Sequence, residues 1–245
     1  MSQLPTPFFR IREQDLLYDI SLLKEALSKN WGSYIMGYSV KTNSLPWLLC
    51  YLKNQGFYAE VVSKTEYDLA LRLGFPAHHM IYNGPIKDRA AFDTVLLSGG
   101  YVNLDSNYEL AWMEELSALY PKQNFKIGLR VNCDIAALCP DETLCSEGGR
   151  FGYCYENGIL ESAINRLSPL PNVTVSGLHL HSSTQSRTVR VFAALAKMAV
   201  QIAAEYGLLL DYIDMGGGYF GGRDDMPDYR DYFKEICRGL SLFFD

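Results

Sequence analysis

The stretch "SYIMGYSVKTN", residues 33–43, places a lysine at the end of an apolar run. Tyr, Ile and Val favour a half-buried strand, and the polar Thr42 and Asn43 that follow Lys41 end it. A lysine in this place either extends from the strand end into water or performs covalent chemistry. Position alone favours the first interpretation, so the choice depends on what surrounds Lys41.

The same pattern recurs along the chain. Six further β-rich runs are predicted to be strands, at residues 58–63, 79–83, 101–105, 125–132, 174–181 and 211–216. Helix-like segments lie between them, without a linker or low-complexity stretch. This alternation of strand and helix predicts one α/β domain built on a parallel sheet.

Helix signals support the alternation. Ser63 and Glu66 form the S-x-x-E capping box of a helix that Gly74 ends. A second helix begins at Asn107, with leucine and methionine near helical spacing, and a longer one begins at Thr188.

The number of units indicates the architecture. Seven predicted strands, each followed by a helix or helix-like segment, indicate a (β/α)8 TIM-type barrel, which needs eight such units in about 250 residues. The last helix is predicted over 228–238, and the closing "LSLFF", residues 240–244, resembles the frayed end of a helix more than a strand. We therefore expect one barrel domain over residues 1–245, truncated before the eighth strand.

Composition excludes several classes of protein. The 245 residues are 48% hydrophobic with a net charge of -6, so they can bury a core but offer no basic surface for nucleic acid or membranes. The N-terminus lacks a signal-peptide pattern, and no apolar run is long enough to span a bilayer. Six cysteines without a C-x-x-C pair indicate a reduced, cytoplasmic protein.

Four motifs lie at the ends of predicted strands. They are Lys41, "RVN" from Arg130, "HLHSSTQ" from His179 and "MGGGYFGG" from Met215. Because reactive groups in α/β barrels gather at the carboxyl ends of the strands, we expect these motifs to form one site.

Two of these motifs have other interpretations. Residues 216–221 read G-x-G-x-x-G, a dinucleotide-binding pattern, but the helix that should follow it is missing. His179 and His181 share one face of a strand and could bind a metal, pack in the barrel wall or stack on a flat cofactor. The only other histidines are His78 and His79, which are adjacent in a loop-like stretch.

The motifs taken together favour one cofactor. A strand-end lysine can form an imine, exposed glycine N–H groups with Ser/Thr hydroxyls can bind a phosphate, and a histidine can stack on a ring. Pyridoxal phosphate uses all three interactions. The covalent interpretation of Lys41 therefore becomes the favoured one.

Seven motifs carry a family resemblance, in the order "YSVKTN", "AEVVSKTE", "YNGPIKD", "GLRVN", "GGRFGY", "GLHLHSSTQ" and "IDMGGGYFG". In this order the chain resembles the fold-type III pyridoxal-phosphate decarboxylases. That family includes diaminopimelate, ornithine/arginine and carboxynorspermidine decarboxylases, with relatives from siderophore and antibiotic pathways. The resemblance covers nearly the whole chain and implies an alanine-racemase-like barrel.

The resemblance implies roles for particular residues. Lys41 would form the Schiff base with the cofactor, and His181 would stack on its pyridine ring. Thr184 and the glycines at 216, 217 and 218 (Gly216, Gly217 and Gly218) would bind the phosphate. The reaction implied is decarboxylation of an amino acid, in which the ring takes up the electron pair that carbon dioxide leaves behind.

The resemblance also places Arg130 and Glu60 near the phenolic side of the ring. The family commonly has Asp at the position of Glu60 and frequently Lys at that of Arg150. Its members continue into an eighth strand with an E-P-G motif and then into a β-rich second domain. That domain completes the active site of a partner subunit, which implies a homodimer for the full-length protein.

The substrate stays open between diaminopimelate, a basic amino acid, a carboxylated polyamine and a siderophore or antibiotic precursor. The alternative function is a non-catalytic pyridoxal-phosphate-binding protein, or an inactive truncated decarboxylase. A metal-dependent barrel hydrolase is a more distant alternative.

Overall fold

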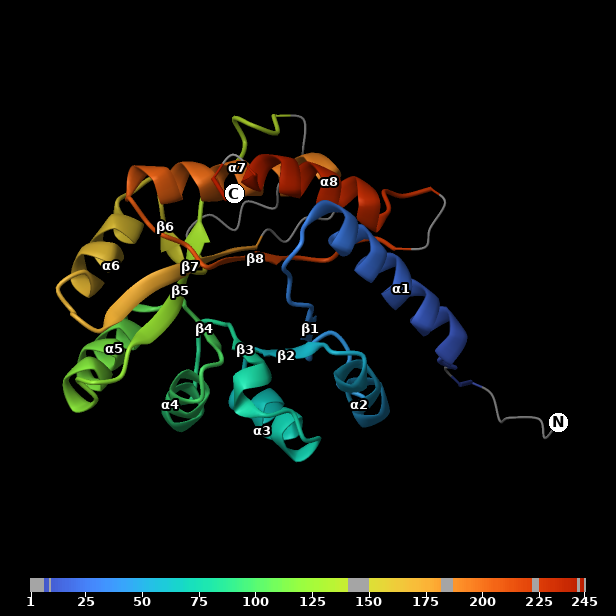
Figure 1. Ribbon diagram of the computed structural model, residues 1–245, viewed down its shortest axis with the longest axis horizontal. Coiled ribbons are helices and arrows are strands. Elements are labelled where there is room, and N and C mark those ends of the chain that lie inside the picture. Colours follow the sequence, from blue (N-terminus) through green and yellow to red (C-terminus); the bar gives the residue numbers. More distant parts are fainter. Residues whose placement is uncertain are drawn as a thin grey trace.

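The computed structural model describes residues 7–8, 10–140, 150–181, 187–221, 225–241 and 243–244. Its centre is a curled parallel sheet in the order β1-β2-β3-β4-β5-β7-β8, with β6 paired to β5 (Figure 1). The strands are β1 Gly37–Ser39, β2 Tyr58–Val61, β3 Met80–Tyr82, β4 Tyr101–Leu104, β5 Phe125–Asn132, β6 Tyr153–Cys154, β7 Val173–His181 and β8 Tyr212–Gly216. All seven predicted strands are confirmed, and only the two-residue β6 was not foreseen. No strand follows β8 among the described residues.

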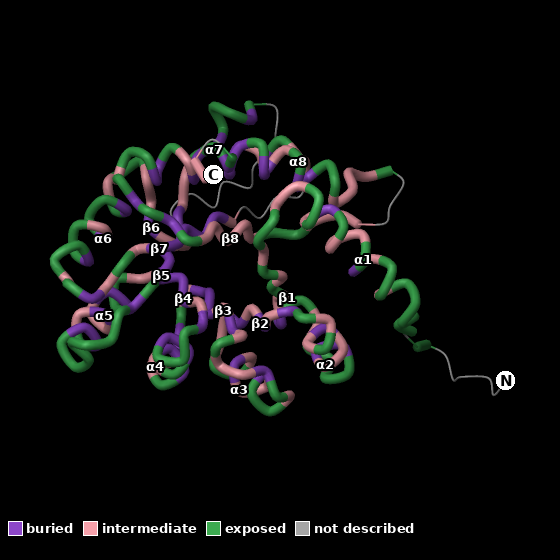
Figure 2. Tube along the Cα trace, in the orientation of Figure 1, coloured by how far each residue is buried: buried purple, intermediate pink, exposed green. Residues whose placement is uncertain are grey.

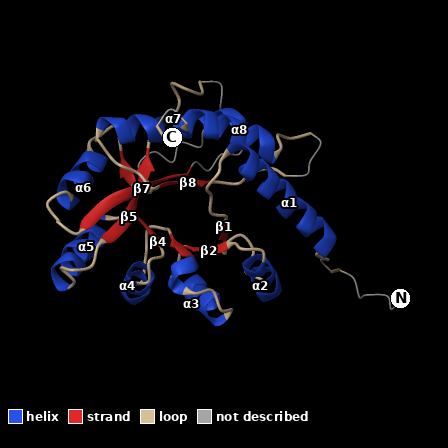
Figure 3. Cartoon of the chain, viewed as in Figure 1, coloured by secondary structure: helices blue, strands red, loops and turns tan. Residues whose placement is uncertain are grey.

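Helices cover the outer face of the sheet (Figure 3). They are α1 Glu13–Asn30, α2 Pro46–Asn54, α3 Lys64–Arg72, α4 Arg89–Leu97, α5 Asn107–Leu119, α6 Ile159–Leu167, α7 Val189–Glu205 and α8 Tyr229–Leu240, with a short 3-10 turn at Ala77–His79. The helices α3 and α5 begin where the sequence predicted them to begin. The Ser63 side chain accepts a hydrogen bond from the Glu66 N–H at the start of α3, and α5 begins at Asn107 behind a capping box of Ser106 and Glu109.

Helix α1 was not predicted, and it completes the outer layer. Ala26 of α1 belongs to a cluster with Ile236 and Leu240 of α8, and Ile20 of α1 packs with Leu48 of α2. The helices therefore form a closed ring, with α1 between α8 and α2 (Figure 1). The inner sheet does not close in the same way, because its hydrogen-bonded path begins at β1 and ends at β8.

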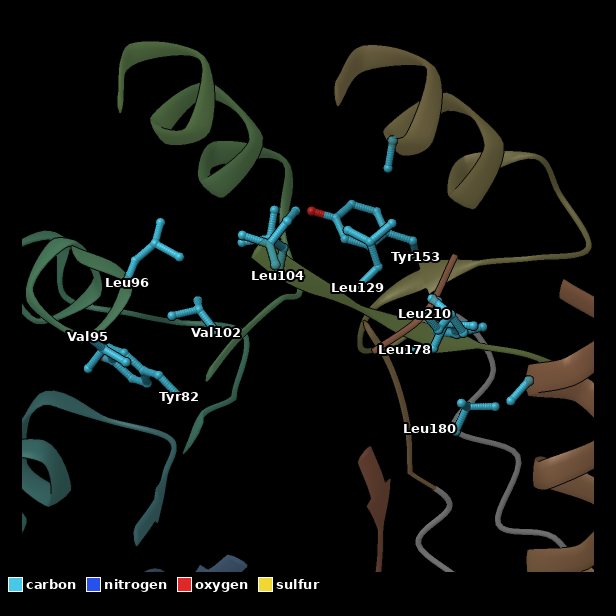
Figure 4. Packing of buried hydrophobic residues seen from close by; sticks show 14 of the residues in the cluster. Tyr82, Val95, Leu96, Val102, Leu104, Leu129, Tyr153, Leu178, Leu180 and Leu210 are labelled. Atoms are coloured by element: carbon cyan, nitrogen blue, oxygen red, sulfur yellow. The ribbon is translucent and has the colours of Figure 1, made fainter. Parts of the chain in front are cut away.

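The main apolar core lies between the sheet and this helix ring. Val102, Leu129 and Leu178 on neighbouring strands are fully buried there, and Val95 of α4 belongs to the same cluster, near Tyr82 and Val102 (Figure 4). In Figure 2 burial follows the strands and the inner faces of the helices, while the outer helix faces are exposed. No helix of the described residues is long and apolar enough to cross a membrane.

Candidate cofactor site

Lys41 lies in the turn that directly follows β1. The Thr42 N–H donates to the Ser39 carbonyl at 3.0 Å, which closes the turn, and Val40 is fully buried. The strand predicted over 33–41 is therefore shorter than expected, and Lys41 is exposed beyond its end. Lys41 therefore lies at the carboxyl end of β1, at the rim of the sheet.

Glu60 lies on the neighbouring strand β2, where it pairs in register with Ser39. Burial raises the pKa of the Glu60 carboxyl, and the nearby Asp214 raises it further, while Lys41 opposes the rise. Glu60 and Lys41 are thus within electrostatic reach of each other. A carboxyl group whose proton is held more tightly than usual can exchange protons with a neighbouring amine.

Asp214 on β8 faces strands β3 and β4 across the curled sheet. Its Oδ2 accepts hydrogen bonds from Nδ2 of Asn83 at 3.2 Å and from Nδ2 of Asn103 at 2.9 Å. The Tyr212 hydroxyl donates to Oδ1 of Asn103 at 2.9 Å. Burial raises the pKa of Asp214, and the two amide donors partly oppose this. These bonds join opposite sides of the sheet interior.

Sequence reasoning missed Asp214, Asn83 and Asn103. Each is a polar residue in or directly after an apolar strand, in "MIYN", "YVNL" and "YIDM". That pattern is the signal that could have found them, because a polar side chain in a buried strand needs a partner.

His179 and His181 lie on the same face of β7, as predicted, with ring centroids 6.2 Å apart. His179 is buried, and within the described residues its Nδ1 has no hydrogen-bond partner. Burial lowers the pKa of His179 to about 3, and Arg130 adds to the effect. His179 is therefore a neutral imidazole, and the less buried His181 is the ring that can contact a ligand.

Gly216 is the last residue of β8, and Gly217 and Gly218 follow it. Gly216 pairs in register with His181, and a Cβ at Gly216 would lie 2.8 Å from Nε2 of His179 and from Nδ1 of His181. Gly217 has a φ of 138°, which only glycine adopts readily. The guanidinium of Arg187 lies beside Gly218. Thr184, the other predicted phosphate ligand, lies outside the described residues.

Arg130 lies near the end of β5, in register with His179 of β7. Its Nη1 donates to Oδ2 of Asp105 at 3.1 Å, and its Cζ is 4.9 Å from the centre of the Phe151 ring. Arg130 therefore places a positive charge beside His179.

The arrangement fits pyridoxal phosphate. It combines an exposed lysine at a strand end, an imidazole on the interior face, and a glycine turn without side chains beside an arginine. Glycine at 216 is what makes room for both histidine rings. No group of three or more His, Cys, Asp or Glu residues able to hold a metal ion occurs in the described part of the chain.

Comparison with known proteins establishes the family. The family model for the pyridoxal-dependent decarboxylase, pyridoxal binding domain, matches residues 17–244. The chain belongs to this family, whose cofactor is pyridoxal phosphate.

Two curated relatives show the range of the family. The chain is 28% identical to a diaminopimelate decarboxylase of Bacteroides thetaiotaomicron, over 98% of this chain and 64% of that protein. It is 26% identical to the L-glutamyl-[BtrI acyl-carrier protein] decarboxylase of Niallia circulans, over 74% of this chain and 43% of that protein. The chain thus spans less than two thirds of these relatives' own length.

Solved structures share the fold. The diaminopimelate decarboxylase of M. jannaschii, in co-complex with L-lysine, matches with a TM-score of 0.77 at 20% identity, over 95% of this chain and 56% of that one. The lysine/ornithine decarboxylase of Vibrio vulnificus, complexed with putrescine, matches with a TM-score of 0.66 at 21% identity, over 92% and 58%. At these identities the likeness concerns the barrel fold.

Proposed function

We propose that this chain is the cofactor-binding barrel of an amino-acid decarboxylase and that Lys41 is the residue that attaches pyridoxal phosphate. One observation carries the proposal. Lys41 lies in the turn after β1, at the same end of the parallel sheet as His181, which ends β7, and Gly216, which ends β8, in a chain whose family is pyridoxal-dependent.

The other site residues have distinct roles in this proposal. His181 contacts the flat face of the ring, and Gly216, Gly217 and Gly218 present backbone N–H groups to the phosphate, with Thr184. Arg130 places a positive charge near the phenolic oxygen of the ring. When bound, pyridoxal phosphate captures the amino group of the substrate and takes up the electron pair released as carbon dioxide leaves.

Proton movement is assigned to the carboxyl groups near Lys41. Lys41 Nζ must lose a proton to act as a nucleophile, and Glu60 is the acceptor we propose because its carboxyl interacts with Lys41. The amide groups of Asn83 and Asn103 hold Asp214 in place by hydrogen bonds. Burial is the main cause of the raised pKa of Glu60, and Asp214 adds to it because the two carboxyl groups repel each other when charged.

The substrate class follows from the relatives and is part of the proposal. Diaminopimelate, basic amino acids and a carrier-bound glutamyl group are the candidates that the names of the relatives suggest. We further propose a cytoplasmic location and a homodimer for the full-length protein.

Cofactor capture tests the proposal. The protein is incubated with pyridoxal phosphate, reduced with borohydride and digested, and the modified peptide is mapped; Lys41→Ala is the matched control. Labelling confined to Lys41, and lost in the variant, supports the proposal. Labelling spread over surface lysines, such as the exposed Lys64, contradicts it.

Release of carbon dioxide separates the two functions that remain. A panel of amino acids labelled at the carboxyl carbon is offered to the loaded protein. Release from one of them establishes a decarboxylase. Labelling of Lys41 without release from any of them identifies a pyridoxal-phosphate-binding protein that does not decarboxylate.

A further inference from the structure

Four charged side chains form a buried row beside the proposed site. Lys87, after β3, and Glu109, on α5, are both 0% exposed, and Nζ of Lys87 lies 2.9 Å from Oε1 of Glu109. Asp105, after β4, is 1% exposed, and its partner Arg130 is 13% exposed. Arg130 is thus the member of the row that reaches the surface of the site.

Hydrogen bonds tie these charges to the backbone. Lys87 Nζ donates to the Gly84 carbonyl at 2.7 Å. Oε2 of Glu109 accepts from the Asp105 N–H at 2.6 Å, which fixes the turn that carries Asp105. The Asp105 carboxylate uses both oxygens: Oδ2 receives Arg130, and Oδ1 receives the Gly152 N–H at 2.7 Å.

Residues 150–152 also contact Arg130 and Asp105. Phe151 packs against the Arg130 guanidinium. Gly152 has a φ of 77°, and a Cβ there would lie 2.6 Å from the Arg130 carbonyl oxygen, so only glycine allows this close approach. The end of the "GGRFGY" motif therefore contacts Arg130 and Asp105 directly.

Stability alone does not explain such a row. Moving an ion pair out of water costs several kcal/mol per ion, and an apolar pair of similar volume is often as stable. Buried charges are better explained where they fix one geometry. The geometry fixed here is that of Arg130, which is held by Asp105 and Phe151 while the other two charges hold Asp105.

We propose that Asp105 is a positioning residue for Arg130, and that the buried Lys87–Glu109 pair and residues 150–152 complete a frame holding the Arg130 guanidinium at the cofactor site. The inference rests on the proposed function, because it assigns the frame to cofactor binding. It goes beyond that function by assigning a positioning role to Lys87, Asp105, Glu109 and residues 150–152, none of which the proposed function places at the cofactor.

The first test needs no cofactor. NMR of the protein labelled with 15N-arginine measures rotation about the Nε–Cζ bond, and Arg130→Lys assigns the signal. We expect this rotation to be about tenfold or more slower in Arg130 than in the exposed Arg12. In Asp105→Asn we expect the rotation of Arg130 to become fast. Glu114→Gln, which changes an exposed pair on α5, is the matched control and leaves Arg130 slow.

The second test measures the affinity for pyridoxal phosphate by absorbance titration. Arg130→Ala and Asp105→Asn should each weaken binding by about tenfold, and the double variant should bind no more weakly than Arg130→Ala alone. The proposal is overturned if wild-type Arg130 rotates as freely as Arg12. It is also overturned if the losses of affinity in Arg130→Ala and Asp105→Asn add in full in the double variant. Failure to label Lys41 refutes the proposed function separately, and the NMR result still decides whether the frame holds Arg130.

Discussion

Replacing Lys87 by methionine should leave Glu109 buried without its counter-ion. Glu109 is 0% exposed, so the folded variant must either bury a charge or keep a proton on the carboxyl. An exposed glutamate has a pKa of 4.5, and burial raises the pKa of Glu109. Keeping it protonated at pH 7 costs about 3.4 kcal/mol, since each pH unit above 4.5 costs about 1.4 kcal/mol.

The free energy of unfolding of Lys87→Met should therefore fall by about 3 to 4 kcal/mol at pH 7, a melting-temperature loss of roughly 6 to 16 °C. The sign of the pH dependence follows from the raised pKa. The folded state binds the proton more tightly, so its stability is retained at low pH and lost as the pH rises above 4.5. At pH 5 the loss should be only about 1 kcal/mol.

Urea unfolding at both pH values measures this, with Arg166→Met as the control because the Arg166–Glu114 pair is exposed at the outer face of α5. The control should lose less than about 1 kcal/mol and show no difference between the two pH values. Replacing Glu109 by methionine as well should restore most of the stability. A loss in Lys87→Met that is the same at pH 5 and pH 7 would refute the reasoning.

Three further changes test other parts of the structure. Gly216→Ala should weaken pyridoxal phosphate binding by about tenfold, because its methyl group displaces the His179 and His181 rings; unchanged affinity in an absorbance titration contradicts this. Burial raises the pKa of Asp214 above 3.8, so its contribution to stability is lost as the pH rises through the raised pKa. Asp214→Asn should flatten that loss in urea unfolding between about pH 4 and pH 7, and parallel curves for the two proteins count against it. Ser63→Ala should lower the free energy of unfolding by about 1 kcal/mol without affecting cofactor affinity, because it removes only the cap of α3.

Local patterns in the sequence were sufficient for the strands and most helix ends. Each predicted strand is a short β-rich run between helix-like segments, and Ser63 marks a helix start because its side chain caps the helix. Helix α1 was missed because Arg12 at its N-cap provides no side-chain cap and few of its residues are buried. Strand β6 is only two residues long and exists through its pairing with β5.

The site could be predicted only in part. Lys41, His181 and the glycines lie at or just after strand ends, so the parallel fold places them at one rim. The contacts of Asp214 with Asn83 and Asn103 join residues more than 100 positions apart, and they exist only because the sheet curls. The row that ends at Arg130 depends in the same way on α5 and on residues 150–152 packing beside β5.

Two groups of side chains inside the curled sheet differ in whether they can gain or lose a proton. Near Lys41, burial raises the pKa of both Glu60 and Asp214, and the charge of Asp214 adds to the rise at Glu60, so these carboxyl groups hold their protons more tightly than exposed ones do. In the other group, Arg130 is paired with Asp105, and the His179 pKa of about 3 keeps that ring neutral. A cofactor that is attached to a lysine and released from it by proton transfer needs both kinds of group, some that exchange protons and some whose charge stays constant. In the proposed function, proton exchange takes place next to Lys41, the proposed attachment point, and the constant charge of Arg130 lies where the ring would be held.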